Sequence, residues 1–284
     1  MRPFSLNIRG RILSFTQPVV MGILNVTPDS FFAGSRVQCA ADIAARASRL
    51  VGEGADMLDI GAYSSRPGAG DVPEAEECRR LEMALRVIRD AVGSDIPVSV
   101  DTFRASVARR CVGEWGADIV NDISGGTLDN EMFDTVADLR CPYILMHMRG
   151  TPSTMQSLTG YADVTADVIA ELSRPLNRLE ELGVADVIID PGFGFAKTLA
   201  QNYELMRNLR AFDILGRPVL VGVSRKSMIT KLLDITAAEA ELPTAVLGAL
   251  AAERGAAILR VHDVAAARQS ITLLNAVEPC LVSE

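Results

Sequence analysis

The stretch Gly183-Val-Ala-Asp-Val-Ile-Ile-Asp190 carries the pattern that predicts the fold. Its glycine suits the end of a helix, where the backbone often turns left-handed. The β-branched residues Val187-Ile-Ile189 are typical of a short buried strand. Asp190 marks the strand tip, and Pro191-Gly192 end the strand there. The stretch therefore predicts a helix end, a turn and a buried strand that finishes on a polar side chain.

The same pattern recurs along the chain. Its other copies are Gly54-Ala-Asp-Met-Leu-Asp59, Gly116-Ala-Asp-Ile-Val-Asn121 and Gly255-Ala-Ala-Ile-Leu-Arg260. Further strands are predicted without this lead-in at Val19–Leu24 before Asn25, Val98–Val100 before Asp101, Tyr143–Met146 before His147, and Val219–Val221 before Gly222. These segments begin roughly 20 to 45 residues apart, with helical segments between them. Continuous apolar strands that alternate with helices indicate a parallel sheet.

Eight such units in 284 residues predict an α/β fold of the (βα)8 TIM-barrel type, in which the chemistry lies at the carboxyl ends of the strands. A doubly wound open sheet is the alternative, because repeats alone do not establish closure. Residues 4–16 alternate apolar and polar around Arg9-Gly10-Arg11, which predicts a β-hairpin before the barrel. Since no linker or composition shift divides the chain, we expect one barrel domain over residues 1–284.

The helical segments add three expectations. A helix should run from about Ala40 to Glu53, and Pro175 should kink or break the helix that lies between Ala166 and Leu182. The segment Pro243–Ala252 is apolar nearly all round, which predicts burial on more than one face. Either the barrel or a second subunit would cover it, and we expect a homodimer.

Composition narrows the class of protein. The formal net charge of −8 argues against a general nucleic-acid binder. Five cysteines lie far apart with no C-x-x-C pair, which favours reduced thiols over disulfides or a zinc site: Cys39, Cys78, Cys111, Cys141 and Cys280. Neither a signal sequence nor an apolar run of membrane-spanning length is recognisable. We therefore expect a cytoplasmic protein without membrane contact.

Polar residues stand at or just after the carboxyl ends of the predicted strands. They are Asn25, Asp59, Asp101, Asn121, His147, Asp190, Ser224 with Lys226, and Arg260 with His262. Because the carboxyl ends of parallel strands meet at one face of a barrel, we expect these side chains to lie close together. Asp101, Asn121 and Asp190 suit a heterocycle with a guanidine-like edge, since paired N–H donors match a carboxylate.

Positive charge is available nearby for a phosphate ester, from Arg66, Lys226, Arg260 and His262. On the residues alone, two plainer interpretations stay open. Asp190 could cap the next helix, and Lys226 and Arg260 could be ordinary solvated charges.

Eight motifs occur in one order along the chain. They are Gly22-Ile-Leu-Asn-Val-Thr-Pro-Asp-Ser-Phe31, Asp59-Ile-Gly-Ala-Tyr-Ser-Ser-Arg-Pro-Gly68, Ser99-Val-Asp-Thr102, Val120-Asn-Asp-Ile123, Met146-His147, Asp190-Pro-Gly-Phe-Gly-Phe195, Gly222-Val-Ser-Arg-Lys-Ser227 and Leu259-Arg-Val-His-Asp263. In these motifs and their order, the chain resembles the dihydropteroate synthases over nearly its whole length. Two loops depart from the commonest family pattern. Ala62, Tyr63 and Ser65 stand where Gly, Glu and Thr are usual, and Ala196 stands where Gly is common. These departures bear on the aminobenzoate pocket rather than on the reaction.

The resemblance implies a reaction and a role for each site residue. The reaction is the condensation of 6-hydroxymethyl-7,8-dihydropterin diphosphate with 4-aminobenzoate, which gives 7,8-dihydropteroate and diphosphate. The pterin would be held by Asp101, Asn121, Met146, Asp190, Phe195 and Lys226. The diphosphate would be held by Asn25, Arg66, Arg260 and His262, with Mg²⁺ on Asn25. The aminobenzoate site would comprise Ser65, Arg66, Pro67, Ser224 and Lys226.

For the chemistry, the resemblance implies a cation-like SN1 step in which diphosphate leaves with help from Mg²⁺, Lys226 and Arg260. Asp101 would favour the cation, and no covalent enzyme intermediate is expected. The first alternative is a pterin-binding methyltransferase that acts on a corrinoid protein, which would give the diphosphate-binding cluster no purpose. The second is a non-catalytic paralogue that binds folate-like ligands, in which the loss of Asn25, Lys226 or His262 would be expected.

Overall fold

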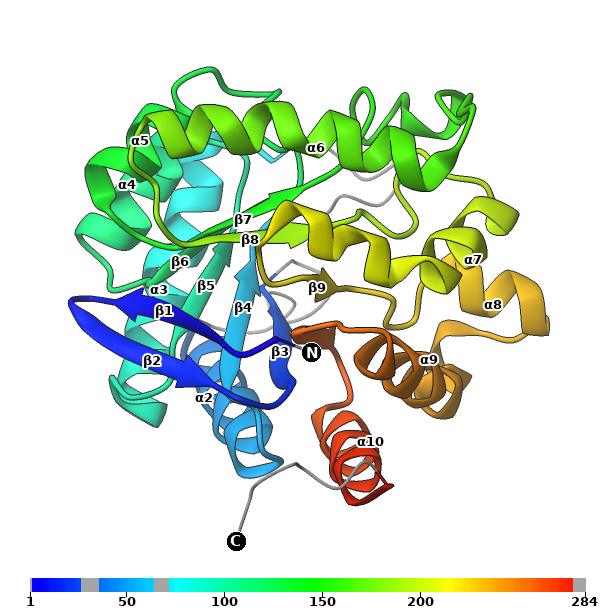
Figure 1. Ribbon diagram of the computed structural model, residues 1–284. Coiled ribbons are helices and arrows are strands. Elements are labelled where there is room, and N and C mark those ends of the chain that lie inside the picture. The colour runs from blue at the N-terminus through cyan, green and yellow to red at the C-terminus, as the bar shows by residue number, and fades with distance from the viewer. Residues whose placement is uncertain (1, 27–35, 64–71, 278–284) are drawn as a thin grey trace, which may run out of the picture.

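The computed structural model describes residues 2–26, 36–63 and 72–277. Its main sheet comprises β3 (Val19–Asn25), β4 (Met57–Gly61), β5 (Val98–Asp101), β6 (Ile119–Asp122), β7 (Tyr143–Met146), β8 (Val187–Asp190), β9 (Leu220–Val221) and β10 (Ile258–Val261). The strands pair in parallel in the order β8-β7-β6-β5-β4-β3-β10-β9. A bridge between Ile189 and Val219 links the two ends of this sheet, and the Ile189 N–H donates to the Pro218 carbonyl at 2.9 Å. The predicted barrel is confirmed, and the open doubly wound sheet is not observed (Figure 1).

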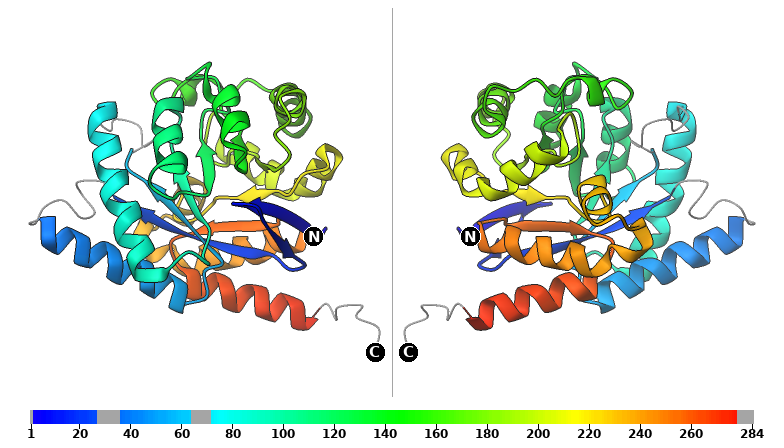
Figure 2. Two further views of the ribbon diagram at one scale, coloured as in Figure 1. Left: turned by 90° about the vertical axis from the view of Figure 1, so that its left-hand side faces the viewer. Right: turned by 90° about the vertical axis from the view of Figure 1, so that its right-hand side faces the viewer.

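Helices surround the strands (Figure 2). They are α2 (Arg36–Gly52), α3 (Glu74–Val92), α4 (Ala105–Gly113), α5 (Met132–Leu139), α6 (Val164–Glu181), α7 (Leu199–Arg207), α8 (Ser227–Leu233), α9 (Glu241–Glu253) and α10 (Val264–Val277), with short 3-10 turns at Met155–Ser157, Leu209–Leu215 and Ala237–Glu239. The glycines of the recurring pattern have positive φ angles: Gly54 98°, Gly116 84°, Gly183 81° and Gly255 98°. Their predicted role at helix ends is therefore confirmed, because side chains other than glycine adopt this backbone only at a cost.

The N-terminal hairpin seals one end of the barrel. Strands β1 (Phe4–Ile8) and β2 (Arg11–Phe15) pair antiparallel, and Arg9 and Gly10 form the two-residue turn with φ angles of 52° and 81°. Leu6 is 1% exposed and packs in a cluster that includes the first residues of several barrel strands, among them Val19 and Met57. The hairpin therefore covers the end of the barrel opposite to the carboxyl ends of its strands.

Helix α6 passes through Pro175, so of the kink or break predicted there, the break is wrong. Proline removes one backbone hydrogen bond, but the helix buries apolar side chains on both sides of it. Leu172 and Leu176, which lie before and after the proline, both pack in the main core. Asp163 caps the start of the helix by accepting from the N–H groups of Thr165 and Ala166, each at 2.9 Å. Helix α2 begins at Arg36, earlier than predicted.

Helix α9 is buried on one side only within this chain. The buried residues are Thr244, Gly248, Ala251 and Ala252. Leu242, Val246 and Leu250 are 74%, 52% and 40% exposed, and their spacing of four places them along one stripe. The barrel therefore does not provide the predicted second covered face.

The cysteines are reduced, and the helices are not of the membrane-spanning kind, among the residues that the structure describes. Cys39, Cys78, Cys111 and Cys141 are buried thiols without disulfide partners, and Cys280 lies outside the described residues. In the part of the chain that the structure describes, every helix is too short or too polar to cross a bilayer.

Candidate active site

A buried network of charges joins four strands at their carboxyl ends. Asp59 on β4 accepts from Arg260 Nε at 2.6 Å and from Asn121 Nδ2 at 3.2 Å. Asp101 on β5 accepts from Arg260 Nη2 at 2.9 Å through Oδ2. Burial of these charges costs free energy that such close pairing offsets. Asp59 is the centre of the network, although the sequence analysis predicts only its position at a strand tip.

The environment of Asp101 makes its carboxyl group easy to protonate. Burial raises the pKa of Asp101 to about 7, with Arg260 acting to lower it and Asp59 acting to raise it further. Its side chain is nevertheless 23% exposed, so one edge of the carboxylate can be reached. A carboxylate with a raised pKa at the mouth of a barrel is a candidate for a functional role.

Asn25 and Asp101 share the space above Gly61. A Cβ added to Gly61 would lie 3.4 Å from Asn25 Oδ1 and 3.7 Å from Asp101 Oδ2. Strands β3 and β5 flank β4, which carries this glycine. The pairing places a neutral oxygen donor next to the reachable carboxylate.

The oxygens of Asn25 and Asp101 are of the kind that Mg²⁺ prefers. They would suit an ion whose remaining ligands are water and substrate oxygens. Mg²⁺ prefers oxygen ligands, keeps several waters and is usually bound through one or two protein groups together with phosphate. Asn25 supplies such an oxygen. Among residues 2–26, 36–63 and 72–277, no group of three or more His, Cys, Asp or Glu side chains could hold a metal without such help.

Asp190 closes the turn after β8. Its Oδ1 accepts from the Gly192 N–H at 2.8 Å, the arrangement of an Asx turn. The N-cap of the next helix is Thr198, whose side chain accepts from the Gln201 N–H. The helix-cap interpretation of Asp190 is therefore wrong. Burial raises the pKa of Asp190, and Lys226 acts against that rise.

Only glycine fits at position 192. Its φ is 73°, and an added Cβ would lie 1.9 Å from the carbonyl oxygen of His147. The loop thus passes directly against the end of β7.

Lys226 reaches the same loop from the other side. Its Nζ donates to the Phe193 carbonyl at 2.7 Å and lies 4.6 Å from the centre of the Phe195 ring. Burial lowers the pKa of Lys226 to about 8, against the influence of Asp190. Lys226 and Arg260 are therefore not ordinary solvated charges, and that interpretation is wrong.

An apolar wall lies beside these polar groups. Met146 and Ala196 are buried in one cluster, with Phe195 packed against them. The other members of this cluster are Ile123, Met148, Met155 and Phe103. The two residues predicted as walls of a flat ligand, Met146 and Phe195, are thus brought together.

Ser224 and His262 form a pair at the ends of β9 and β10. Ser224 Oγ lies 3.0 Å from His262 Nδ1 and accepts from the His262 backbone N–H at 3.2 Å. If the hydroxyl donates to Nδ1, the imidazole keeps its proton on Nε2. Arg225 holds the two loops together through a bidentate pair with Asp263 at 3.1 and 2.6 Å.

Three residues predicted for the aminobenzoate site lie outside the described residues: Ser65, Arg66 and Pro67. Their neighbour Tyr63 packs edge-on against Phe103, with 5.2 Å between ring centres. The Arg104 guanidinium lies over both rings, at 5.7 and 5.0 Å from their centres. Tyr63 therefore belongs to a cluster of two aromatic rings and one guanidinium group just after β4.

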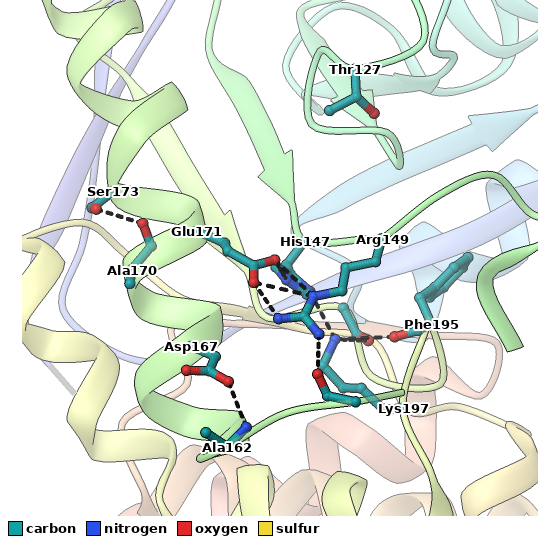
Figure 3. Close-up of polar contacts among 12 residues, drawn as sticks. Thr127, His147, Arg149, Ala162, Asp167, Ala170, Glu171, Ser173, Phe195 and Lys197 are labelled. Carbon is teal, nitrogen blue, oxygen red and sulfur yellow. Dashed lines mark hydrogen bonds and ion pairs between the residues drawn. The ribbon is translucent and has the colours of Figure 1, made fainter. Parts of the chain in front are cut away.

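Lys197 was not predicted to matter. It is 4% exposed, and its Nζ donates to the carbonyls of Gly192 at 3.0 Å and Phe195 at 3.1 Å and to His147 Nδ1 at 3.0 Å. His147 Nε2 in turn lies 2.9 Å from Glu171 Oε2 (Figure 3). His147 therefore contacts α6 and Lys197, whereas Asp59, Asp101 and Asn121 belong to the Arg260 network.

Comparison with known proteins gives the family. Residues 21–262 match the family described as pterin binding enzyme. A dihydropteroate synthase of Synechocystis sp. is 43% identical over 260 residues, which cover 90% of this chain and 89% of that relative. The structure of Xanthomonas albilineans dihydropteroate synthase with 4-aminobenzoic acid superposes with a TM-score of 0.89 at 41% identity, covering 97% of this chain and 98% of that one. A structure of the Xanthomonas albilineans enzyme with 7,8-dihydropteroate gives 0.86 at 38% identity, covering 97% and 99%. The chain therefore belongs to the dihydropteroate synthase family of pterin-binding enzymes.

Proposed function

We propose that the protein condenses 6-hydroxymethyl-7,8-dihydropterin diphosphate with 4-aminobenzoate to form 7,8-dihydropteroate and diphosphate. The observation that carries this proposal is the convergence of two carboxylates and two cations at one end of the barrel. Lys226 is close enough to Asp190 and Asp101 for both carboxylates to act on its pKa, and Arg260 donates to Asp101 at 2.9 Å. Relatives named dihydropteroate synthase match nearly the whole chain, and one of them is a structure with 7,8-dihydropteroate.

The pterin ring is held in this proposal by Asp101, Asn121 and Asp190, with Lys226 on its carbonyl side. Ring N–H groups and the exocyclic amine donate to the carboxylates, which match such paired donors. Met146 and Phe195 pack against the faces of the ring, in keeping with their shared apolar cluster. Because Asp190 Oδ1 is engaged with Gly192, Oδ2 is the oxygen that we assign to the ligand.

The diphosphate is held by Asn25, Arg66, Arg260 and His262. Asn25 would hold Mg²⁺, and a bound Mg²⁺ would supply charge neutralisation for the leaving group. The Ser224 contact favours a proton on His262 Nε2, and this nitrogen can then donate to a phosphate oxygen. The aminobenzoate occupies a pocket formed by Ser65, Arg66, Pro67, Ser224 and Lys226.

Departure of diphosphate is the step that most needs assistance. The bond between the methylene carbon and the diphosphate oxygen breaks, and its electron pair leaves with the diphosphate. Arg260 and Lys226 stabilise that charge, while the carboxylate of Asp101 favours the cation left on the methylene and ring. The neutral arylamine then forms the C–N bond, and its extra proton passes to water. Asp101, Lys226 and Arg260 are the catalytic residues of this proposal.

The remaining proposals concern domain organisation, cellular location and oligomeric state. We propose one domain, a cytoplasmic location and a homodimer that covers the exposed stripe on α9. A methyltransferase acting on a corrinoid protein is not favoured, because it would leave the Ser224–His262 pair and the Lys226–Arg260 cations without a diphosphate to hold.

The test is an assay of diphosphate release with each substrate alone and with both together. We expect release only when both the pterin diphosphate and 4-aminobenzoate are present. Release without the arylamine would indicate a hydrolase. Pterin binding without release would indicate a methyltransferase or a non-catalytic paralogue.

A further inference from the structure

We propose that Lys197 is a positioning residue for the pterin site, because it fixes the loop 190–197 that presents Asp190 and Phe195. The inference rests on the proposed function of that site. Lys197 belongs to none of the substrate-binding groups assigned above. It acts through the loop backbone rather than through contact with a substrate.

Lys197 holds the loop through two of its backbone carbonyls. Lys197 Nζ donates to the carbonyls of Gly192 and Phe195, at 3.0 and 3.1 Å. Gly192 is the residue whose N–H orients the Asp190 carboxylate, and Phe195 is the proposed ring wall. One ammonium group therefore fixes the backbone next to both ligand-facing side chains.

The loop 190–197 has an unusual backbone, with three residues at positive φ. Gly192, Gly194 and Ala196 have φ angles of 73°, 82° and 50°. Alanine in the left-handed region is unfavourable, and such a conformation persists only where its surroundings fix it. Lys197 and its bond to the Phe195 carbonyl lie on either side of Ala196, so they restrain the strained residue directly.

Lys197 is itself held in place by three hydrogen bonds. An ammonium group has three N–H donors, and two carbonyls and His147 Nδ1 account for all three. Since Nδ1 accepts, the neutral ring carries its proton on Nε2, which points at Glu171 Oε2 at 2.9 Å. Burial, followed by the charge of Lys197, lowers the pKa of His147 to about 4, so the ring remains a neutral acceptor near neutral pH.

The network ends on helix α6 (Figure 3). Glu171 on α6 is ion-paired with Arg149, whose guanidinium lies 3.7 Å from the centre of the Tyr161 ring. Since α6 is continuous and packed on the barrel core, it offers a rigid support. The path from α6 through Glu171, His147 and Lys197 thus connects the scaffold to the pterin loop.

The test compares Lys197→Met with Lys231→Met. Methionine keeps the apolar stem but removes all three donors, and Lys231 is an exposed lysine on α8 that serves as a matched control. Binding of pterin-6-carboxylic acid is measured by calorimetry, and KM is measured for each substrate. Lys197→Met should weaken probe binding and raise the KM for pterin diphosphate about tenfold, since both hydrogen bonds from Lys197 to the loop carbonyls are lost. The KM for 4-aminobenzoate at saturating pterin diphosphate should change less than about twofold.

A purely structural role predicts another result. Lys197→Met would then lower Tm and the active fraction, with probe affinity and KM unchanged, and that result would overturn the proposal. If wild type fails to bind the probe and to turn over, the proposed function fails and takes the inference with it. If wild type binds and turns over but Lys197→Met binds equally well, only the inference fails.

A second pair of variants protects the test against misfolding of Lys197→Met. His147→Asn offers an amide oxygen near the place of Nδ1, whereas His147→Leu offers no acceptor. We expect His147→Leu to weaken probe binding and His147→Asn to keep most of the wild-type affinity. Equal probe affinity in the two variants would contradict the role of the His147–Lys197 contact.

Discussion

Asp101 stands between two opposing influences, and its charge state should decide turnover. Arg260 favours its carboxylate, while burial and Asp59 favour its neutral form. Asp101→Asn keeps the size of the side chain and removes the negative charge. We expect kcat at saturating pterin diphosphate to fall by about a hundredfold, because the charge that favours the cation is lost. Turnover that survives intact in steady-state assays would show that Asp101 only binds the ring.

The pH profile reports on two residues at once. The proposed chemistry needs Asp101 ionised and Lys226 protonated, and their pKa values are shifted to about 7 and about 8. Activity should therefore fall as pH drops through about 7, where Asp101 gains a proton, and fall again as pH rises through about 8, where Lys226 loses one.

Lys226→Arg separates the two limbs of that profile. Arginine stays protonated across this range, so the alkaline limb of kcat/KM should move upward while the acid limb stays in place. An alkaline limb that is unchanged in the variant would assign it to another group.

For single residues, the sequence predicted which side chains form the site better than it predicted their contacts. The strand-tip rule located Asp101, Asn121 and Asp190, because parallel strands end at one face. It could not predict that Lys197 would be buried against His147. That contact depends on how the loop after β8 meets the end of β7, and spacing along the chain does not contain this information.

Among the elements, the N-terminal hairpin serves stability rather than chemistry. Leu6 is buried with the first residues of the barrel strands, opposite to the site. Leu6→Ala should lower the free energy of unfolding by about 2–4 kcal/mol, because it leaves a cavity in that cluster. Urea unfolding gives the value. Ile12→Ala, at a 63% exposed position on β2, is the matched control and should cost less than about 0.5 kcal/mol.

Activity distinguishes this interpretation from a role of the hairpin in catalysis. Leu6→Ala should keep both KM values at a temperature where it remains folded. A rise in either KM without loss of folded protein would link the hairpin to the site.

The elements also show where local rules give way to packing. The recurring glycine pattern predicted strands and helix ends correctly, since both depend on local backbone preference. Of the kink or break predicted at Pro175, the break is wrong, because apolar contacts on both sides of the proline outweigh one missing hydrogen bond.

For the molecule as a whole, the stripe of Leu242, Val246 and Leu250 is the main apolar feature that α9 leaves uncovered. We expect a second copy of the chain to cover it. Leu242→Glu, at the most exposed position of the stripe, should convert the dimer to a monomer, since a charge in an apolar interface is costly. Light scattering coupled to size exclusion measures the mass.

The control variant is Ile12→Glu, which places the same charge on the exposed hairpin strand and should remain dimeric. A wild-type mass equal to one chain, 30.4 kDa, would contradict the homodimer. So would a Leu242→Glu mass that stays at twice that value.

The most direct test of the whole account is the stoichiometry of products from the two proposed substrates. Purified protein with Mg²⁺, pterin diphosphate and 4-aminobenzoate is followed by mass spectrometry for 7,8-dihydropteroate and by a coupled assay for diphosphate. We predict that the two products form in equal amounts and that neither forms when one substrate is withheld. Diphosphate without dihydropteroate, or no product under conditions in which a pterin probe binds, would contradict the account.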